Sequence, residues 1–373
     1  MHIGVDVRNL TSPSVTGIAR VLLETVRALG ARGVRFTFFW PGKRHSSLVD
    51  ELDARHVESM FSSEAGRLIW GEATLSYAVR RAAPDVFWGP AHRLPPSVSP
   101  SIPTVVTIHD LVWRRFPETM PIKRRLADRA LMSLAIRRAD RVVAVSHATA
   151  RDIEDLFGRP NAIVVYPGAR RLTSSTGSTE RQFEIEHSPY ALFVGTLEPR
   201  KNLPRLLEAF ARARAEAKAN WRLVVAGGKG WLDNDIHDAL APLVADGSVV
   251  LTGRLRDDEL ATLYSGARFV AMPSLYEGFG LPIVEAQLYG VPVLAGRAGS
   301  LPEVTGAAGI LVDPRDVGEI AQGITRLFAD DQLHAALAAE TRKNAEKFTW
   351  DETARGMLNV FEDAMKHHPR RMP

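Results

Sequence analysis

Short apolar runs alternate with longer segments of helical periodicity along most of the chain. Residues 2–7 and 34–40 are apolar runs suited to buried strands, and between them apolar residues recur at helical spacing across 18–29. Further strands are predicted at residues 85–88, 104–108, 141–146 and 162–166, with helices at 68–82, 121–138 and 147–156. This alternation favours a parallel sheet that helices cover on both faces.

The pattern stops at residues 170–188 and then restarts. Residues 173–179 are Ser, Thr and Gly only, which is typical of a linker. Strands are then predicted at residues 190–194, 222–226, 249–252, 269–272, 291–295 and 309–312, with helices between them. We therefore predict an N-terminal domain at 1–170, a linker at 171–188, a second domain at 189–348 and a terminal helix and tail at 349–373.

Length and composition agree with two α/β domains. The chain has 373 residues, and this length is too great for one ordinary hydrophobic core. Its apolar content of 45% is normal for a globular protein. It has no cysteine, no apolar stretch long enough to span a bilayer and no signal-peptide pattern, so we expect a cytoplasmic protein. The formal charge of +4 and the pI near 9.4 suit an anionic ligand or surface.

The segment 271–294 reads as strand, glycine loop, helix and strand. Gly278 and Gly280 leave backbone N–H groups uncovered where the helix begins, and Pro282 suits its first turn. A helix N-terminus flanked by glycine is a ready anion site. Glu277 and Glu285 add two carboxylates, which accept hydrogen bonds from sugar or ribose hydroxyls. These residues alone leave two interpretations open, a phosphate-linked sugar site or a tight turn with two solvated glutamates.

Two other strand ends carry candidate chemistry. Arg200 and Lys201 follow a predicted strand and open a helix, where two adjacent cations suit a diphosphate; a solvated basic turn is the alternative. His109 ends the apolar strand 104–108, with Asp110 as its expected local partner. A histidine in that place is often purely structural. Ligands of open α/β sheets bind at the carboxyl ends of strands, where all these candidates fall.

The run Glu-Gly-Phe-Gly-Leu-Pro-Ile-Val-Glu, from Glu277 to Glu285, resembles the paired-glutamate motif of the retaining family 4 glycosyltransferases. The likeness extends over nearly the whole chain and is most specific in its second half. It implies the α/β fold called GT-B, in which two Rossmann-like domains face each other across a cleft. The nucleotide-sugar donor is then held mainly by the second domain, and the terminal helix of 349–373 is expected to cross back to the N-terminal domain.

The resemblance also assigns roles to residues. Arg200 and Lys201 are expected to stabilise the leaving diphosphate, Glu277 to orient the sugar hydroxyls, and His109 to lie against the transferred sugar, so these four are the predicted catalytic residues. The predicted donor site comprises Gly17, Arg200, Lys201, Arg254, Leu255, Glu277, Gly278, Phe279, Gly280, Leu281 and Glu285. Glu285 is expected to accept from the ribose hydroxyls.

One departure from the family concerns the loop before the first helix. The family usually has two glycines there, whereas this chain has Thr16 and Gly17, which puts the geometry of that loop in question. No metal site and no cofactor are predicted, because protein cations can stabilise the departing diphosphate and the nucleotide sugar is itself a substrate.

The activity implied by the resemblance is transfer of a hexose from a nucleotide diphosphate sugar to an acceptor hydroxyl with retention. Mannose from GDP-mannose, in polysaccharide or glycolipid synthesis, is our specific hypothesis. Another GT-B enzyme, such as a nucleotide-sugar epimerase or a phosphorylase, and a non-catalytic sugar-binding protein remain alternatives. A nicotinamide dehydrogenase is disfavoured, since the first strand lacks a Gly-x-Gly-x-x-Gly turn.

The partners predicted are a nucleotide-sugar donor and a glycan or lipid-linked acceptor, with no nucleic acid. Basic and apolar residues interleave across 114–141, as in an interfacial helix. We therefore predict peripheral contact with the anionic inner face of a membrane. A solvated helix that packs on its own sheet is the ordinary alternative.

Overall fold

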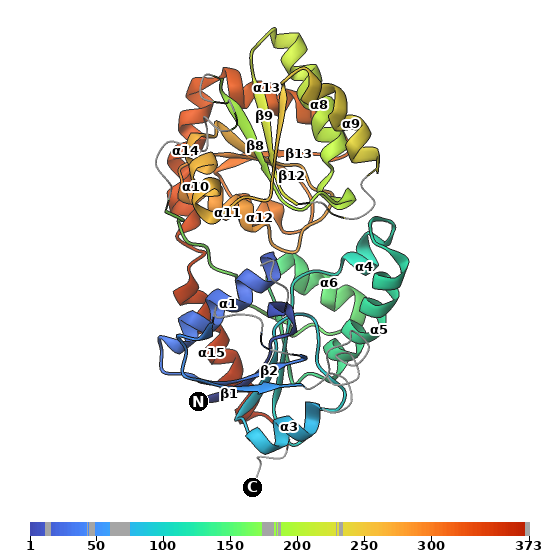
Figure 1. The fold of residues 1–373 in the computed structure, drawn as a ribbon, viewed down its shortest axis with the longest axis vertical. Helices are drawn as coiled ribbons and strands as arrows, with labels where there is room; N and C mark the ends of the chain where they lie inside the picture. Colours follow the sequence, from blue (N-terminus) through green and yellow to red (C-terminus); the bar gives the residue numbers. More distant parts are fainter. Residues whose placement is uncertain are drawn as a thin grey trace. The chain divides into compact units, whose positions relative to one another are not determined.

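A computed structural model describes residues 1–11, 16–42, 44, 49–59, 75–173, 183, 185, 188–228, 230 and 234–369. The chain divides into two compact units, drawn as a ribbon in Figure 1. Unit 1 comprises residues 1–113, 123–168 and 350–373, and unit 2 comprises 114–122 and 169–349. Most of the predicted linker lies outside the described residues.

Unit 1 contains a seven-stranded parallel sheet in the order β3-β2-β1-β4-β5-β6-β7. Its strands are β1 (His2–Asp6), β2 (Arg35–Trp40), β3 (Ala54–Glu58), β4 (Val86–Gly89), β5 (Thr104–Ile108), β6 (Arg141–Ala144) and β7 (Ile163–Val164). The sequence pattern did not predict β3. This strand carries Arg, His and Glu, and its residues are half-buried or exposed at the edge of the sheet, so no apolar run marks it.

The helices of unit 1 follow their strands in the expected alternation. They are α1 (Gly17–Gly30), α3 (Leu75–Ala82), α4 (Val112–Arg115, shared with unit 2), α5 (Ile122–Arg138), α6 (His147–Phe157) and α15 (Trp350–Lys366), with the short 3-10 turn η1 (Arg8–Leu10). The 3-10 turn η4 (Pro117–Thr119) belongs to unit 2. The Thr16 side chain caps α1 by accepting from Ala19 N. Of the apolar residues that recur across 18–29, Leu22, Val26 and Leu29 are buried, and Ile18 and Val21 are half-buried.

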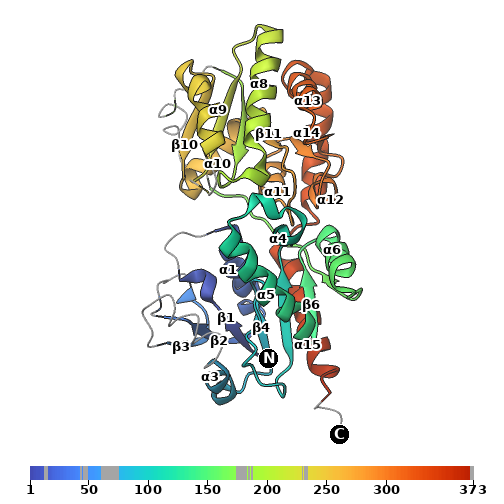
Figure 2. The same cartoon turned by 90° about the vertical axis from the view of Figure 1, so that its right-hand side faces the viewer.

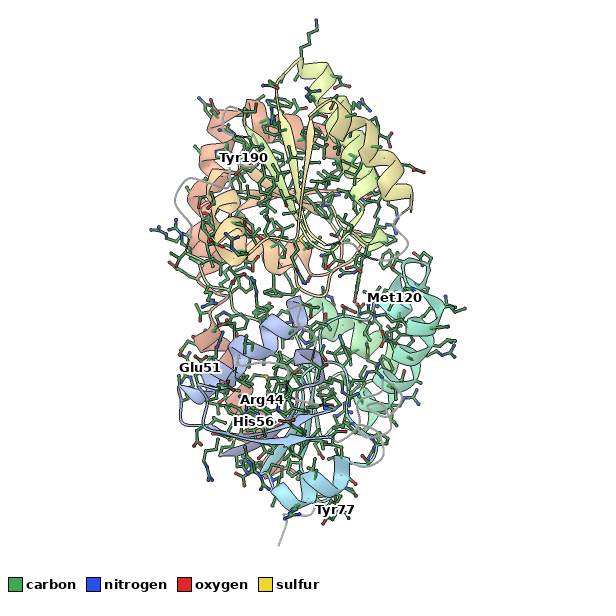
Figure 3. All side chains as sticks on the ribbon, viewed as in Figure 1. Arg44, Glu51, His56, Tyr77, Met120 and Tyr190 are labelled. Carbon is green, nitrogen blue, oxygen red and sulfur yellow. The ribbon has the colours of Figure 1, made fainter. Side chains whose placement is uncertain are left out.

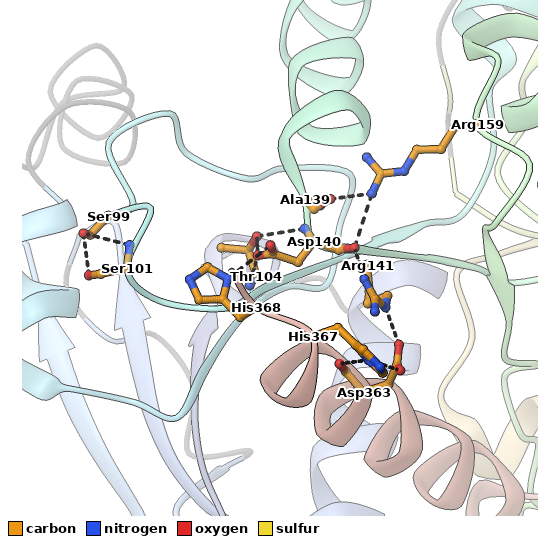
Figure 4. Close-up of polar contacts among 10 residues, drawn as sticks. All are labelled: Ser99, Ser101, Thr104, Ala139, Asp140, Arg141, Arg159, Asp363, His367 and His368. Carbon is orange, nitrogen blue, oxygen red and sulfur yellow. Dashed lines mark hydrogen bonds and ion pairs between the residues drawn. The ribbon is translucent and has the colours of Figure 1, made fainter. Parts of the chain in front are cut away.

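Helix α15 joins unit 1 although it follows all of unit 2 in the sequence. Met357 and Phe361 belong to the same buried core as the β1 residue Ile3, and the Phe361 ring lies 5.7 Å from the Trp88 ring. A polar network holds the end of this helix to the sheet (Figure 4). In it, Asp363 bonds to Arg141, and His368 contacts the Asp140 carboxylate, which also accepts from Thr104.

Unit 2 contains a six-stranded parallel sheet in the order β10-β9-β8-β11-β12-β13. Its strands are β8 (Tyr190–Val194), β9 (Arg222–Ala226), β10 (Val249–Gly253), β11 (Phe269–Met272), β12 (Val293–Gly296) and β13 (Gly309–Val312). Numbered within the unit, this is the 3-2-1-4-5-6 order of a Rossmann fold. The first six strands of unit 1 have the same order. The predicted fold of two Rossmann-like parallel sheets is therefore confirmed.

The helices of unit 2 cover both faces of its sheet (Figure 2). They are α8 (Leu203–Ala217), α9 (Asn234–Ala245), α10 (Asp257–Gly266), α11 (Leu281–Leu288), α12 (Leu301–Thr305), α13 (Val317–Ala329) and α14 (Asp331–Ala345), with the 3-10 turn η5 (Pro199–Lys201). Phe210 of α8 and Ile324 of α13 share one apolar core with strand residues such as Phe193. On β8, the Tyr190 hydroxyl donates to the Leu263 carbonyl (2.8 Å), which fastens α10 to the sheet (Figure 3).

Among the residues that the structure describes, no helix is both long and apolar enough to cross a membrane.

Candidate functional site

The reversal of strand order in unit 2 lies between β8 and β11, which are neighbours in the sheet. In open α/β sheets, ligands bind outside the carboxyl ends of the strands at this switch point. The loop after β8 carries Arg200 and Lys201, and the loop after β11 carries Glu277. The fold therefore brings together residues that lie more than seventy positions apart in the sequence.

The cationic loop is held in place by Asn202. This residue has φ of 63°, an unusual value for a residue other than glycine. Its buried side-chain amide donates to the carbonyls of Pro273 (2.9 Å) and Pro314 (2.5 Å). The Arg200 carbonyl also accepts from Leu275 N (2.8 Å). The two loops at the switch point are thus tied to each other by their backbones.

Two cations and two carboxylates form a connected ion-pair cluster at this point. Arg200 donates to Glu277 Oε2 at 2.5 Å and to Glu198 Oε1 at 2.9 Å, and Lys201 Nζ lies 2.6 Å from Glu277 Oε1. Glu198, Lys201 and Glu277 are buried, and the Arg200 side chain is 16% exposed. Pairing compensates the cost of holding these charges away from water. Sequence reasoning missed Glu198.

The ionisation of Glu277 follows from these neighbours. Burial raises the pKa of Glu277, but the charges of Arg200 and Lys201 outweigh burial and lower the pKa to about 2. Glu277 is consequently a carboxylate throughout the physiological pH range. It can accept hydrogen bonds from hydroxyl groups, but it is a very weak proton acceptor.

The Glu277 loop is supported from the side of the β12–α12 connection. The buried Ser300 hydroxyl donates to the carbonyls of Glu277 (3.0 Å) and Phe279 (2.8 Å). Gly299 has φ of +56°, and a Cβ there would lie 2.5 Å from the Glu277 carbonyl oxygen, so only glycine fits. Gly280 has φ of +99° and precedes α11. The predicted strand, loop and helix are confirmed, and Ser300 is a support that the sequence did not indicate.

Glu285 lies on α11, one turn into the helix, and is buried. Its carboxylate accepts from the Tyr264 hydroxyl at 2.7 Å. The fully buried Tyr264 ring stacks on Tyr289, with the ring centroids 5.5 Å apart. The Tyr289 hydroxyl in turn donates to the Leu172 carbonyl (2.8 Å) and accepts from Leu172 N (2.9 Å). Glu285 is therefore positioned by residues that sequence reasoning did not single out.

The remaining donor-site predictions occupy the same edge of the sheet of unit 2. Gly278 and Phe279 are buried in the loop, and Leu281 is the first residue of α11. Arg254 is exposed and Leu255 half-buried after β10, beside Gly253, whose carbonyl accepts from Gly227 N.

In unit 1 the predicted residues lie at the carboxyl ends of β1 and β5. Gly17 opens α1 and is exposed. His109 is buried, and its Nε2 lies 2.8 Å from the Pro90 carbonyl oxygen. The Asp110 carboxylate accepts from Val112 N, so Asp110 acts on His109 through its charge and not through a hydrogen bond. Burial lowers the pKa of His109, and the Pro90 hydrogen bond and the Asp110 charge only partly oppose it.

No group of three His, Cys, Asp or Glu side chains within the described ranges could hold a metal ion. The absence of a metal from the mechanism stays a prediction, as do the roles assigned to single residues.

Comparison with known proteins places this geometry in a family. The family model for Glycosyltransferase Family 4 matches residues 15–170, and the model for Glycosyl transferases group 1 matches residues 177–347. O-antigen chain mannosyltransferase B of Escherichia coli is 29% identical over 93% of this chain and 96% of its own. Serotype-specific mannosyltransferase WbdA of Escherichia coli is 27% identical over 82% of this chain, which spans only 40% of that relative.

A solved structure of another protein has the same fold. Sucrose-phosphate synthase from Thermosynechococcus elongatus superimposes with a TM-score of 0.76 over 98% of this chain and 99% of its own, at 19% identity. At that identity the likeness concerns the fold alone. Together, the two family models and the full-length O-antigen relative show that the chain belongs to the family 4 glycosyltransferases (glycosyl transferases group 1), which transfer sugars from nucleotide-sugar donors.

Proposed function

We propose that this glycosyltransferase transfers mannose from GDP-mannose to a hydroxyl of a glycan acceptor, with retention at the anomeric carbon, in the synthesis of a polysaccharide or glycolipid. The relatives named as mannosyltransferases, one of them for the O-antigen chain, support the choice of sugar and product. The observation that carries the proposal is the ionised Glu277 carboxylate held between Arg200 and Lys201 at the switch point of unit 2.

The two cations bind the donor diphosphate. Arg200 and Lys201 already donate to Glu277, and they share these hydrogen bonds with the diphosphate oxygens when the donor binds. As the bond between the anomeric carbon and the phosphate oxygen breaks, negative charge grows on the diphosphate. Preorganised cations that face this charge stabilise the transition state more than the ground state.

The proton of the acceptor hydroxyl does not go to Glu277. A general base works best with a pKa near the operating pH, and the pKa of Glu277 is about 2. The carboxylate instead orients the donor sugar by accepting from its hydroxyls. A donor phosphate oxygen takes the acceptor proton on the face that the leaving group vacates. The new bond therefore forms on that face, and the configuration is retained.

The remaining donor contacts follow from the same edge of the sheet. Glu285 accepts hydrogen bonds from the ribose hydroxyls, with its carboxylate oriented by the Tyr264 hydroxyl. The backbone N–H groups at the start of α11 add to the anion site beside it. In unit 1, Gly17 allows the backbone to approach a phosphate closely, and His109 contacts the transferred hexose.

A panel of nucleotide sugars tests the proposal. Thermal shift should be largest with GDP-mannose, and a glycan acceptor should then gain mannose with the anomeric configuration of the donor, as read by NMR. Conversion of the donor without an acceptor would indicate an epimerase. Turnover that requires free phosphate would indicate a phosphorylase. Binding of a nucleotide sugar without any turnover across acceptors would favour a sugar-binding protein.

The basic segment 114–141 supports a lipid-linked acceptor at an anionic membrane. The side chains of Ile122 and Leu126 on α5 are 62% and 54% exposed, and exposed Lys123, Arg124 and Arg129 lie among them. Exposed apolar residues next to cations are typical of a helix that lies at a membrane surface. This face would dock on the cytoplasmic leaflet, each basic residue adding about 1 kcal/mol, screened by salt.

Co-sedimentation with vesicles tests the membrane contact. Binding should require anionic lipid and should fall when Lys123, Arg124 and Arg125 all become Ser. The matched control replaces the exposed basic residues Arg212, Lys218 and Lys343 of unit 2 with Ser. Equal losses in both triple variants, or binding that ignores lipid charge, would return α5 to an ordinary solvated helix.

A further inference from the structure

His92 lies at the carboxyl end of β4, where the strand order of unit 1 reverses between β1 and β4. Its φ is +64°, a left-handed conformation shared by only three other non-glycine residues of the described chain. The backbone before it turns tightly, because a Cβ at Gly89 would lie 1.8 Å from the Arg93 carbonyl oxygen. Strained residues of this kind concentrate at ligand sites, where the surrounding structure holds them in place.

The hydrogen bonds around His92 define which nitrogen carries the proton in each of two imidazoles. His92 N donates to the Thr107 carbonyl (3.0 Å), and His92 Nδ1 lies 3.4 Å from the backbone N of His109. A backbone N–H only donates, so Nδ1 of His92 accepts and its proton resides on Nε2. In His109, Nε2 faces the Pro90 carbonyl, which only accepts, so that nitrogen carries the proton and Nδ1 accepts.

The second nitrogen of each ring is available to a ligand. Nε2–H of His92 and Nδ1 of His109 have no hydrogen-bond partner among the described residues, and the His92 side chain is only partly buried. The ring centroids are 5.2 Å apart with an interplanar angle of 75°. One ring thus has a donor and the adjacent ring an acceptor to offer at this switch point. A sugar carries neighbouring hydroxyls that can accept from the one and donate to the other.

Both rings stay neutral. Burial, outweighing the Asp110 charge and helped by His109, Arg93 and Arg124, lowers the pKa of His92 to about 3. The pKa of His109 is lowered too. Asp128, which pairs with Arg93 and Arg124, is the other charged group of this part of unit 1. Neutral rings of fixed tautomer suit an uncharged ligand.

We propose that His92 and His109 together bind one sugar ring, with His92 donating to one hydroxyl and His109 accepting from its neighbour. The ligand is the transferred hexose, so this inference deepens the proposed function and rests on it. His92 is then a further residue of unit 1 that contacts substrate.

Substitution of His92 by Gly removes the imidazole and keeps the left-handed backbone, which glycine adopts without strain. His92→Asn keeps both the backbone and an N–H donor. Lys218→Gly is the matched control, because Lys218 also has a positive φ (48°) but is exposed at the end of α8. Both glycine variants should melt at a higher temperature than wild type. A lower melting temperature in His92→Gly would show that the imidazole is structural and would overturn the proposal.

Calorimetry then compares GDP with GDP-mannose in each variant. His92→Gly should bind GDP as wild type does. The ratio of its GDP-mannose affinity to its GDP affinity should be about fivefold lower than in wild type. His92→Asn should recover most of that loss, and Lys218→Gly should show none. Unchanged GDP-mannose affinity in His92→Gly overturns the proposal. If wild type itself binds GDP-mannose no better than GDP, the donor assignment fails, and the best nucleotide sugar of the panel replaces it in the same comparison.

Side-chain ¹⁵N spectra of the histidines give a readout that requires neither turnover nor a known donor. Both His92 and His109 should show the Nε2–H tautomer at pH 8, and His92 should keep it down to pH 5, with His92→Gly identifying the His92 signals. The opposite tautomer at either position at pH 8, or a protonated His92 ring above pH 5, would overturn the donor–acceptor pair.

Discussion

The carboxyl ends of the two sheets present opposite kinds of chemistry on nearly the same scaffold. At the switch point of unit 2, Arg200 and Lys201 share the Glu277 carboxylate, and every group is charged. At the switch point of unit 1, His92 and His109 lie together as neutral imidazoles. The strand order is common to both, so it does not explain the difference.

The difference teaches that the loops determine what each sheet edge can bind. A diphosphate needs buried cations, and buried cations need carboxylates to compensate them until the ligand arrives. A sugar ring needs donors and acceptors of fixed direction and no net charge. We propose accordingly that the sheet edge of unit 2 suits a diphosphate and that the sheet edge of unit 1 suits a neutral sugar ring.

The largest effect is expected from removing a cation at the switch point of unit 2. Lys201→Ala removes one of the two cations that face the developing charge, and kcat/KM should fall about 100- to 1000-fold. The control is Arg212→Ala, which removes a cation from the exposed pair with Glu216 on α8 and should change activity less than twofold. If Lys201→Ala lost no more activity than this control, the diphosphate would be bound elsewhere.

A smaller effect is expected where a carboxylate meets an uncharged part of the nucleotide. Glu285→Ala should weaken binding of the nucleoside diphosphate by about 1.5–3 kcal/mol, because a charge-assisted hydrogen bond to the ribose is lost. Tyr264→Phe only releases the orientation of that carboxylate and should cost less. Calorimetry orders the two variants. Wild-type affinity in Glu285→Ala would contradict the ribose assignment.

The strand pattern of the sequence was enough to predict both sheets. Buried parallel strands are continuous apolar runs, such as 190–194 and 269–272, and need no tertiary information. The edge strand β3 was missed because Arg55, His56 and Glu58 break such a run. Helix α12 (Leu301–Thr305) was missed because five residues are too few to show a period.

The sequence predicted only those site residues that a local pattern marks. Arg200, Lys201 and Glu277 follow apolar runs at places where strands end. Glu198 and Tyr264 were missed because their importance depends on partners that the fold brings to them, and Tyr264 lies 21 residues before Glu285. The left-handed conformation of His92 could not be foreseen, since glycine or asparagine would normally mark such a position.

The two switch points should also differ in how their residues make stability depend on pH. The pKa of His92 falls from 6.5 to about 3 on folding, so below pH 6.5 the unfolded chain binds a proton there that the folded chain does not. Its contribution to stability is lost as the pH falls from 6.5 towards 3. The pKa of Glu277 falls from 4.5 to about 2, so its contribution is lost only between those values.

Denaturant unfolding of wild type and His92→Gly from pH 7 to pH 4 measures this difference. The free energy of unfolding should decline less steeply in His92→Gly, so the advantage of the variant should grow as the pH falls. A constant difference between the two proteins over this range would mean that His92 titrates alike in the folded and unfolded chains.

The smallest effect is expected from removing divalent metal. Because Arg200 and Lys201 supply two positive charges at the diphosphate, turnover in excess chelator should equal turnover without it. Loss of activity that magnesium or manganese restores would show that a divalent metal ion is needed at the diphosphate in addition to Arg200 and Lys201.

The position of α15 has a consequence for synthesis on the ribosome. Met357 and Phe361 complete the core around β1, yet they are translated after all of residues 169–349. At the usual rate of about 5–20 residues per second, that core waits roughly 10 to 40 s for its last helix. The second unit is synthesised during this time and is complete only at its end. The nascent first unit meanwhile exposes the apolar surface that α15 will cover, and there it would be open to chaperones.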